Sequence, residues 1–206
     1  MKVGIIMGSK SDLDTMKKAS AVLDEFKIPY EMVIASAHRT PEAVKNFVTR
    51  LEDEGAIAFI AGAGAAAHLP GVVASFTTLP VIGIPLNATA LKGIDSLLAI
   101  VQMPSGMPVA TMAVDGAKNA ALFAVQIGAA FNKDLKEQYV QYRKDMADKV
   151  LADNAELQGA IQIYTYKSLV IKCWLRKTVY LDIYYIVCTI NYDKGERSWL
   201  TSIWKN

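Results

Sequence analysis

The chain has 206 residues and a formal net charge of +2, a length that allows one domain to bury a hydrophobic core. The charge is uneven: residues 160–206 hold seven Lys and Arg against three Asp and Glu, whereas residues 1–159 hold 15 against 17. This balance excludes the strongly basic class of nucleic-acid binders, and we expect no nucleic-acid partner. Both cysteines, Cys173 and Cys188, lie in the last segment, so residues 1–159 contain neither disulfides nor cysteine metal sites.

Neither end of the sequence predicts a membrane segment. The N-terminal residues lead directly into an apolar, strand-like run rather than the apolar region of a signal peptide. In the C-terminal segment the longest run without charge, Ile183–Tyr192, has ten residues and is too short to span a bilayer. We therefore expect a cytoplasmic protein with no membrane partner.

In chain order, apolar runs alternate with stretches of helical spacing. The runs predict five strands, at Val3–Met7, Tyr30–Ala35, Ala56–Ala61, Pro80–Ile84 and Val109–Val114. Helices are predicted at Leu13–Phe26, Glu42–Glu54, Val72–Thr78, Leu91–Gln102, Ala117–Phe131 and Leu135–Gln158. Such alternation requires a parallel sheet with helices on both faces. Five strands favour a three-layer, flavodoxin-like α/β fold with strand order 2-1-3-4-5.

Ligands of such folds bind at the carboxyl ends of the strands, where this sequence places three polar turns. The first, Gly8–Asp12, opens onto a helix, and its serine hydroxyls and helix N–H groups suit a phosphate. Its spacing matches neither a P-loop nor a dinucleotide fingerprint, and the Asp12 carboxylate suits a ribose hydroxyl. Alternatively, Ser11 or Asp12 is only a helix N-cap.

The second turn, Ser36-Ala37-His38-Arg39-Thr40-Pro41, combines a hydroxyl, an imidazole and a guanidinium. Thr40 is predicted to be an N-cap and Pro41 the first helical residue, so Arg39 lies where a helix start favours an anion. Alternatively, Ser36 and Arg39 belong to an ordinary loop.

The third turn, Gly62–Gly71, has almost no side-chain bulk, so a ligand can lie against its backbone. The alternative is close packing of a helix on the sheet, with His68 as a structural histidine. The sequence has only two histidines, and no His-x-x-x-His pattern or cysteine pair accompanies them, so we expect no metal.

Four motifs together resemble one family. They are Gly-Ser-Lys-Ser-Asp at 8–12, Ser-Ala-His-Arg-Thr-Pro at 36–41, Ala-Ala-His-Leu-Pro-Gly at 66–71 and Gly-Ile-Asp-Ser-Leu-Leu-Ala-Ile-Val-Gln-Met-Pro at 93–104. Over residues 1–158 the chain resembles the class I N5-carboxyaminoimidazole ribonucleotide mutases (the PurE family) of purine biosynthesis. The resemblance implies a flavodoxin-like fold, a homo-octamer with active sites between subunits, and no cofactor. It also implies an isomerase that moves a carboxylate of the ribonucleotide from N5 to C4.

The same resemblance implies roles for individual residues. His38 is the acid/base, and Ser9, Asp12 and Arg39 bind the ribonucleotide, with Ser36 assisting at the phosphate. The Gly62–Gly71 loop covers the imidazole and the carboxylate, through the residues Gly64, Ala65, His68 and Leu69. Three alternatives stay open: direct carboxylation of aminoimidazole ribonucleotide with CO2, a non-catalytic nucleotide-binding module, and a flavin-binding electron carrier, the weakest of the three.

The chain departs from the family pattern in three places. Ala65 stands where the family has a second glycine, and the loop around Asp115 is about two residues short. Residues 159–206 match nothing in the family and change abruptly in composition. We interpret residues 1–158 as the catalytic domain and 159–206 as an extension, with frame-shifted or read-through sequence as the leading hypothesis and a packing or oligomer-modifying extension as its rival. Two structures stay open for that extension, which contains runs such as Tyr180–Val187: one or two strands, or a segment packed on the body.

Overall fold

The computed structural model describes the backbone of residues 1–175 and the side chains of residues 1–168. The chain divides into two units, Met1–Arg143 and a second that begins at Lys144, and each is considered by itself. The first unit contains every strand among the described residues and all of the polar turns singled out above.

The first unit is built on a parallel sheet of five strands in the order β2-β1-β3-β4-β5. The strands are β1 (Lys2–Met7), β2 (Tyr30–Ile34), β3 (Ala56–Gly64), β4 (Val81–Leu86) and β5 (Ala110–Thr111). All four neighbouring pairs are parallel, as the connecting helices require. The predicted fold class and strand order, 2-1-3-4-5, are confirmed.

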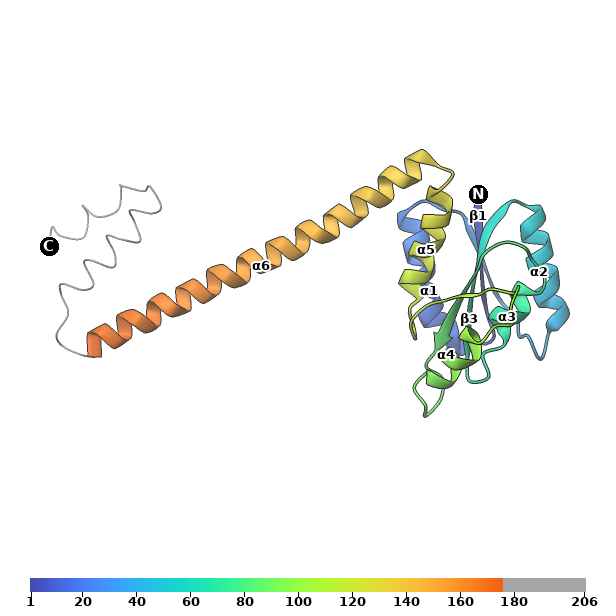
Figure 1. Ribbon diagram of the computed structural model, residues 1–206, viewed down its shortest axis with the longest axis horizontal. Helices are drawn as coiled ribbons and strands as arrows, with labels where there is room; N and C mark the ends of the chain where they lie inside the picture. The colour runs from blue at the N-terminus through green and yellow to red at the C-terminus, as the bar shows by residue number, and fades with distance from the viewer. Residues whose placement is uncertain (176–206) are drawn as a thin grey trace. The chain divides into compact units, whose positions relative to one another are not determined.

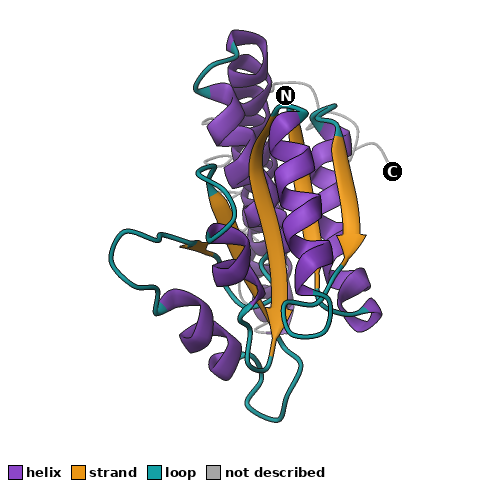
Figure 2. Cartoon of the chain, turned by 90° about the vertical axis from the view of Figure 1, so that its right-hand side faces the viewer, coloured by secondary structure: helices purple, strands orange, loops and turns teal. Residues whose placement is uncertain are grey.

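Helices cover both faces of this sheet (Figures 1 and 2). The helices among the described residues are η1 (Lys10–Asp12), α1 (Leu13–Glu25), α2 (Pro41–Asp53), α3 (Leu69–Ala74), α4 (Ile94–Val101), α5 (Ala117–Ala129) and α6 (Lys133–Leu175). Helices α1 and α5 pack side by side on one face, and α2, α3 and α4 contact the other. The result is the three-layer arrangement that the alternating pattern predicts.

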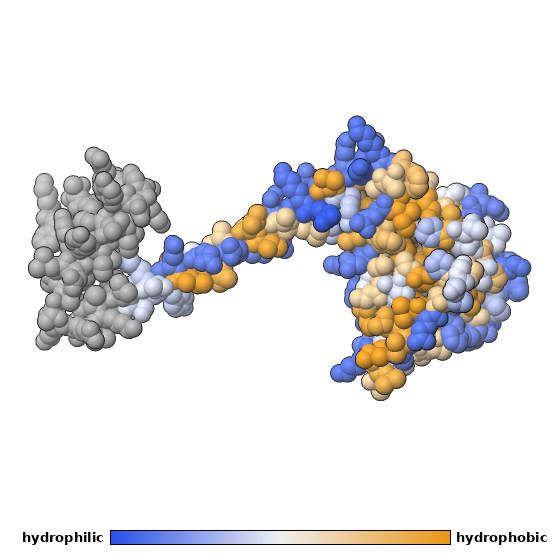
Figure 3. All heavy atoms as spheres, in the orientation of Figure 1, coloured by the Kyte–Doolittle hydropathy of each residue, from blue (hydrophilic) through white to orange (hydrophobic). Residues whose placement is uncertain are grey.

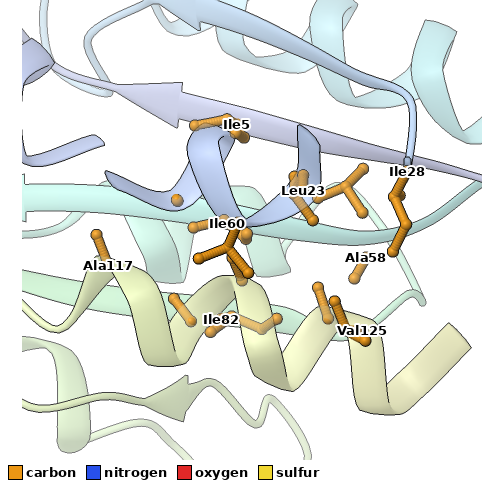
Figure 4. Packing of buried hydrophobic residues seen from close by; sticks show 14 of the residues in the cluster. Ile5, Leu23, Ile28, Ala58, Ile60, Ile82, Ala117 and Val125 are labelled. Carbon is orange, nitrogen blue, oxygen red and sulfur yellow. The ribbon is translucent and has the colours of Figure 1, made fainter. Parts of the chain in front are cut away.

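The core consists of two hydrophobic layers, one on each side of the sheet. Ile5 and Ile6 are adjacent in β1 and fully buried, yet they belong to opposite layers because successive side chains of a strand alternate between its faces. Figure 4 shows the layer beneath α1 and α5, where Leu23 and Val125 pack against Ile60 and Ile82. Burying a side chain of this size contributes about 1.5–3 kcal/mol, so this continuous core holds the strand ends in place.

Strand β3 is three residues longer than predicted. Its last residues were expected in a loop, but Gly62 pairs with Ile84 and Gly64 pairs with Leu86 of β4. A Cβ at Gly62 would lie 2.4 Å from the Sδ of Met16 in α1. At Gly62, therefore, the lack of side-chain bulk serves close helix–sheet packing, the alternative interpretation of this stretch.

Several other boundaries differ from the predictions, and β5 spans only Ala110–Thr111 instead of Val109–Val114. Helix α3 begins at Leu69 instead of Val72, because Pro70 suits the first turn of a helix. Helix α4 begins at Ile94 instead of Leu91, since Gly93 before it has a φ of 89°, which does not belong to a right-handed helix. Strand β4 continues through Pro85: β5 pairs with β4 only at Ile82 and Gly83, so no ladder bond to β5 is lost there.

Helix α6 continues well past the predicted end at Gln158, as far as Leu175. The expectation of strands in the extension is therefore wrong for residues 159–175, and Tyr180–Val187, where a strand was also considered, lies outside the described residues. Although α6 is long, no helix within residues 1–175 combines the length and apolar character needed to cross a membrane.

Candidate functional site

The turns that follow β1, β2 and β3 meet in a cavity of about 310 Å³ at the carboxyl ends of the strands. This is where parallel α/β sheets bind their ligands. The cavity brings together all nine residues singled out from the sequence. They are Ser9, Asp12, Ser36, His38, Arg39, Gly64, Ala65, His68 and Leu69.

The first turn is organised by a capping box. The Ser9 hydroxyl accepts the Ser11 N–H at 3.3 Å, and the Asp12 carboxylate accepts the Ser9 N–H at 3.1 Å. Asp12 also accepts a hydrogen bond from the Ser11 hydroxyl. The alternative that Ser11 or Asp12 is only an N-cap holds in part: Asp12 takes the N-cap position of α1 without a side-chain capping bond, and the N-cap of η1 is Ser9 instead of Ser11. All three residues line the cavity.

Burial of the Asp12 side chain raises the pKa of its carboxyl. The hydrogen bonds from Ser11 and Ser9 and the positive charge of Arg39 lower this pKa, but they do not overcome the loss of hydration. Asp12 consequently stays protonated to a higher pH than an exposed aspartate does.

The second turn is tied to the first through Arg39. Its Nη2 donates to the Gly8 carbonyl at 2.9 Å, and its Nε donates to the Ser36 hydroxyl at 3.3 Å. One guanidinium donor therefore joins the second turn to the first, and the other stays within the second turn. The positive charge stays at the exposed mouth of the cavity, where an anion can reach it.

Thr40 takes the predicted N-cap position of α2, with Pro41 at the start of the helix. Its hydroxyl, however, makes no capping bond. The Thr40 Oγ1 instead accepts the Ser36 N–H at 2.8 Å and donates to the Ser36 carbonyl, which closes the turn on itself. Thr40 therefore fixes the loop that presents His38 and Arg39.

The third turn has two alanines in the left-handed region, Ala65 with φ 53° and Ala67 with φ 45°. Glycine adopts this region easily, whereas alanine does so at a cost of about 1–2 kcal/mol. At position 65 this chain therefore holds, with an alanine, a backbone conformation that favours glycine.

The two histidines of the chain meet at the centre of the site. The Nε2 of His38 lies 2.9 Å from the Nδ1 of His68, and the rings form an edge-on pair. Both residues are exposed and both line the cavity. Such an arrangement combines a titratable group with a fixed cation at a strand end, which suits proton transfer on an anionic ligand.

Sequence reasoning missed some residues that line the cavity. Ala88 comes from the loop after β4, and Ala37 and Ala63 flank the recognised positions. The rule that sites form at strand ends could have identified Ala88, because it follows the buried strand β4 by two residues. Among the described residues no group of three or more His, Cys, Asp or Glu side chains is placed to hold a metal.

Fold and site together define an α/β protein of flavodoxin-like topology with an anion-friendly cavity and a histidine pair at the strand ends. The AIR carboxylase family model matches residues 2–149, and the chain belongs to this family.

Individual relatives agree with this assignment. The N5-carboxyaminoimidazole ribonucleotide mutase of Pyrococcus horikoshii is 57% identical over 148 residues, which cover 72% of this chain and 84% of the relative. The Synechocystis protein of the same name is 54% identical over 156 residues, which cover 76% of this chain and 89% of that relative. Among solved structures, Treponema denticola PurE is similar with a TM-score of 0.71 and 31% identity, over 76% of this chain and 98% of that one.

Proposed function

We propose that this chain is an isomerase of purine biosynthesis that converts N5-carboxyaminoimidazole ribonucleotide to 4-carboxy-5-aminoimidazole ribonucleotide. The observation that carries the proposal is the meeting of His38, Arg39 and the small-residue loop in one cavity. Family membership and the names of the similar relatives support the choice of substrate. Neither a cofactor nor a metal takes part in the proposed reaction.

The cavity divides into an anion end and a proton-transfer end. At the anion end, Arg39 and the hydroxyls of Ser36 and Ser9 bind the phosphate and the ribose. The Asp12 carboxylate accepts a hydrogen bond from a ribose hydroxyl. At the other end lie His38, His68 and the backbone of Gly64–Leu69, which covers the imidazole and the carboxylate. The absence of bulky side chains in that loop lets the flat heterocycle approach the backbone closely.

The proposed chemistry requires two proton transfers, which together leave the protonation state of the enzyme unchanged. The substrate carries its carboxylate on N5 as a carbamate, and protonation of N5 breaks the N–C bond and releases CO2. C4 of the ring then attacks the trapped CO2, and the proton on C4 must be removed. One histidine gives the first proton and accepts the second, so His38 ends in its initial state.

Trapping CO2 requires that water be kept out between the two steps. The loop Gly64–Leu69 carries small or apolar side chains apart from His68 and lies over the histidine end of the cavity. Closure of such a loop over the ring limits both the escape of CO2 and its hydration.

The test of this function is the substitution His38→Asn, assayed with N5-carboxyaminoimidazole ribonucleotide. We expect turnover to fall by at least about 10²–10⁴-fold, the usual contribution of a general acid/base, while affinity for the product stays within a few-fold. Turnover that survives the substitution would refute the proposed role of His38. Loss of product binding in the variant would instead point to a misfolded or non-catalytic site.

A second assay separates the mutase from the direct carboxylase that the family model's name describes. The parent enzyme is incubated with aminoimidazole ribonucleotide and bicarbonate, or with N5-carboxyaminoimidazole ribonucleotide without bicarbonate. The mutase proposal expects product rapidly from the second mixture only. Bicarbonate-dependent product from the first mixture, at a comparable rate, would favour the carboxylase.

We also propose that the enzyme works in the cytoplasm as a homo-octamer with its sites between subunits. The assembly is supported by an apolar row along and just before α4, with Leu91, Ile94, Leu98 and Val101 all 50–62% exposed. Figure 3 shows hydrophobic residues gathered on the surface over this helix. The row begins three residues after Ala88, which lines the cavity, so a subunit packed on it would lie beside the site.

Catalysis is proposed to need only residues 1–158, with residues 159–206 as an extension outside the family's domain. The family match over residues 2–149 supports this division. Intact-mass measurement on protein from its native source tests it: a product that ends near Gln158 would identify the extension as frame-shifted or read-through sequence.

A further inference from the structure

The contact between the two histidines restricts how the site can hold protons. A hydrogen bond between the Nε2 of His38 and the Nδ1 of His68, 2.9 Å apart, contains a single proton. Either His38 donates it, or His68 does. The outer nitrogens, Nδ1 of His38 and Nε2 of His68, have no hydrogen-bond partner among the described residues.

The two arrangements behave differently when His38 acts as acid and base. If His68 donated the shared proton, neutral His38 would carry its own proton on Nδ1, and Nε2 would be its acceptor. Protonating that acceptor would place two N–H groups face to face and break the contact. If His38 donates from Nε2, its Nδ1 gains and loses a proton freely while the bond to His68 persists.

We propose that His68 is a positioning residue that accepts the Nε2 proton of His38, so that the Nδ1 of His38 is the nitrogen that exchanges a proton with the substrate. This inference rests on the proposed function. In the cycle, doubly protonated His38 gives its Nδ1 proton to N5 as the carbamate bond breaks. Neutral His38, still donating from Nε2, then accepts the C4 proton at Nδ1, and His68 stays neutral throughout.

The surroundings of the pair agree with a positioning role. His68 immediately precedes α3, and the neighbouring residues Leu69 and Pro70 are buried, so a packed helix holds its backbone. The charged groups that share the cavity with the pair are Arg39, from the same turn as His38, and Asp12, from the first turn.

Nuclear magnetic resonance of the full chain with 15N-labelled histidine tests the atom assignment directly. The chain has only these two histidines, and the variants His38→Asn and His68→Asn each retain one, which assigns the signals. With both rings neutral, we expect both protonated nitrogens to be Nε2, with coupling across the hydrogen bond between His38 Nε2 and His68 Nδ1. A proton on the Nδ1 of His68, or no coupling between the rings, overturns the proposal.

Kinetics of two substitutions test the positioning role. His68→Leu removes the acceptor, and we expect kcat to fall by up to about 10²-fold with little change in KM, because His38 loses its orientation. His68→Asn offers an amide oxygen near the position of Nδ1 and should recover most of kcat. Parent-like kcat in His68→Leu, an effect confined to KM, or an Asn variant as impaired as Leu each overturns the role.

The two experiments also separate this inference from the proposed function. If the parent converts neither ribonucleotide, the proposed function fails, whereas the resonance measurement still determines which histidine donates. If the parent is active and the resonance signals show His68 as the donor, the function stands and the positioning role is refuted.

Discussion

At the scale of single residues, the loop over the site holds a backbone conformation that its sequence does not favour. Ala65 and Ala67 both have positive φ, and Ala65 is exposed, so its side chain gains little from packing. The strain is stored in the segment proposed to cover the reacting ring, where a preformed shape reduces the ordering cost on binding.

Replacement of Ala65 by glycine should relieve this strain. We expect Ala65→Gly to raise the free energy of unfolding by up to about 1 kcal/mol, because the cost of the left-handed conformation exceeds the entropy that glycine adds to the unfolded chain. Ala66, which is also exposed but has no positive φ, is the matched control. Ala66→Gly should lower the free energy of unfolding by about 0.5–1 kcal/mol. Urea unfolding measures both; equal effects would contradict the assignment of strain to position 65.

The raised pKa of Asp12 makes stability depend on pH in a definite direction. Because the folded state favours the protonated carboxyl, the stability that Asp12 contributes is present at low pH and is lost as pH rises through its raised pKa. We therefore expect the unfolding free energy of the parent, relative to Asp12→Asn, to decrease as pH rises above 3.8, the ordinary value.

Urea unfolding of both proteins between about pH 4 and 7 measures this difference. Asp14→Asn removes another carboxyl from the exposed side of α1 and serves as the control for net charge. A difference that increases with pH would show that the hydrogen bonds and Arg39 outweigh burial at Asp12.

At the scale of elements, the site depends on how closely the end of β3 approaches the loop after β4. A Cβ on Gly64 would lie 2.4 Å from the Cβ of Ala88 and 3.6 Å from the Leu86 carbonyl oxygen. Neither neighbour is the end of a flexible side chain, so added volume must displace backbone. The narrow gap between these two segments therefore shapes one wall of the cavity.

We expect Gly64→Ala to destabilise the protein by about 1–3 kcal/mol, the cost of overpacking a close contact. Gly8 also lines the cavity, but a Cβ there meets no atom within 4 Å, so Gly8→Ala should be neutral or stabilising by up to about 1 kcal/mol. Thermal and urea unfolding compare the two. If both variants are equally stable, the approach of β3 to Ala88 does not constrain the fold.

At the scale of the whole molecule, the exposed apolar row at α4 is the feature that most needs a partner. Large hydrophobic side chains gathered in one place on a surface mark an interaction site, whereas single ones do not. Because the row begins three residues after Ala88 of the cavity wall, the proposed subunit contact would lie beside the site.

Substitution of Leu98, in the middle of this row, should break the proposed octamer. We expect Leu98→Glu to give smaller species in light scattering and to lower turnover, because a buried unpaired charge costs several kcal/mol at an interface. Phe131→Glu changes a side chain that is 91% exposed outside α4 and is the control. An unchanged mass for Leu98→Glu, with the fold intact by circular dichroism, would show that α4 is not the interface.

Much of the fold follows from local patterns. The alternation of short apolar runs with helical spacing predicts a parallel sheet, the number of strands favours its order, and the Thr-Pro pair places the start of α2 at residue 41. The same patterns locate the three turns, because a strand buried on both faces must end where polar residues begin. Element boundaries are less predictable, as β4 and α3 show, since pairing and packing partners set them.

The sequence by itself determined the topology, the three turns and the residue types of the site, because these depend on spacing along the chain. Only the tertiary structure decided which atoms meet. The contact between His38 and His68 joins residues 30 apart, and Ala88 enters the cavity from the loop after β4, which was not among the three turns. The division of small residues between packing at Gly62 and the cavity wall at Gly64 also depends on neighbours from other elements. Such contacts arise from the geometry of the folded sheet, which no local pattern encodes.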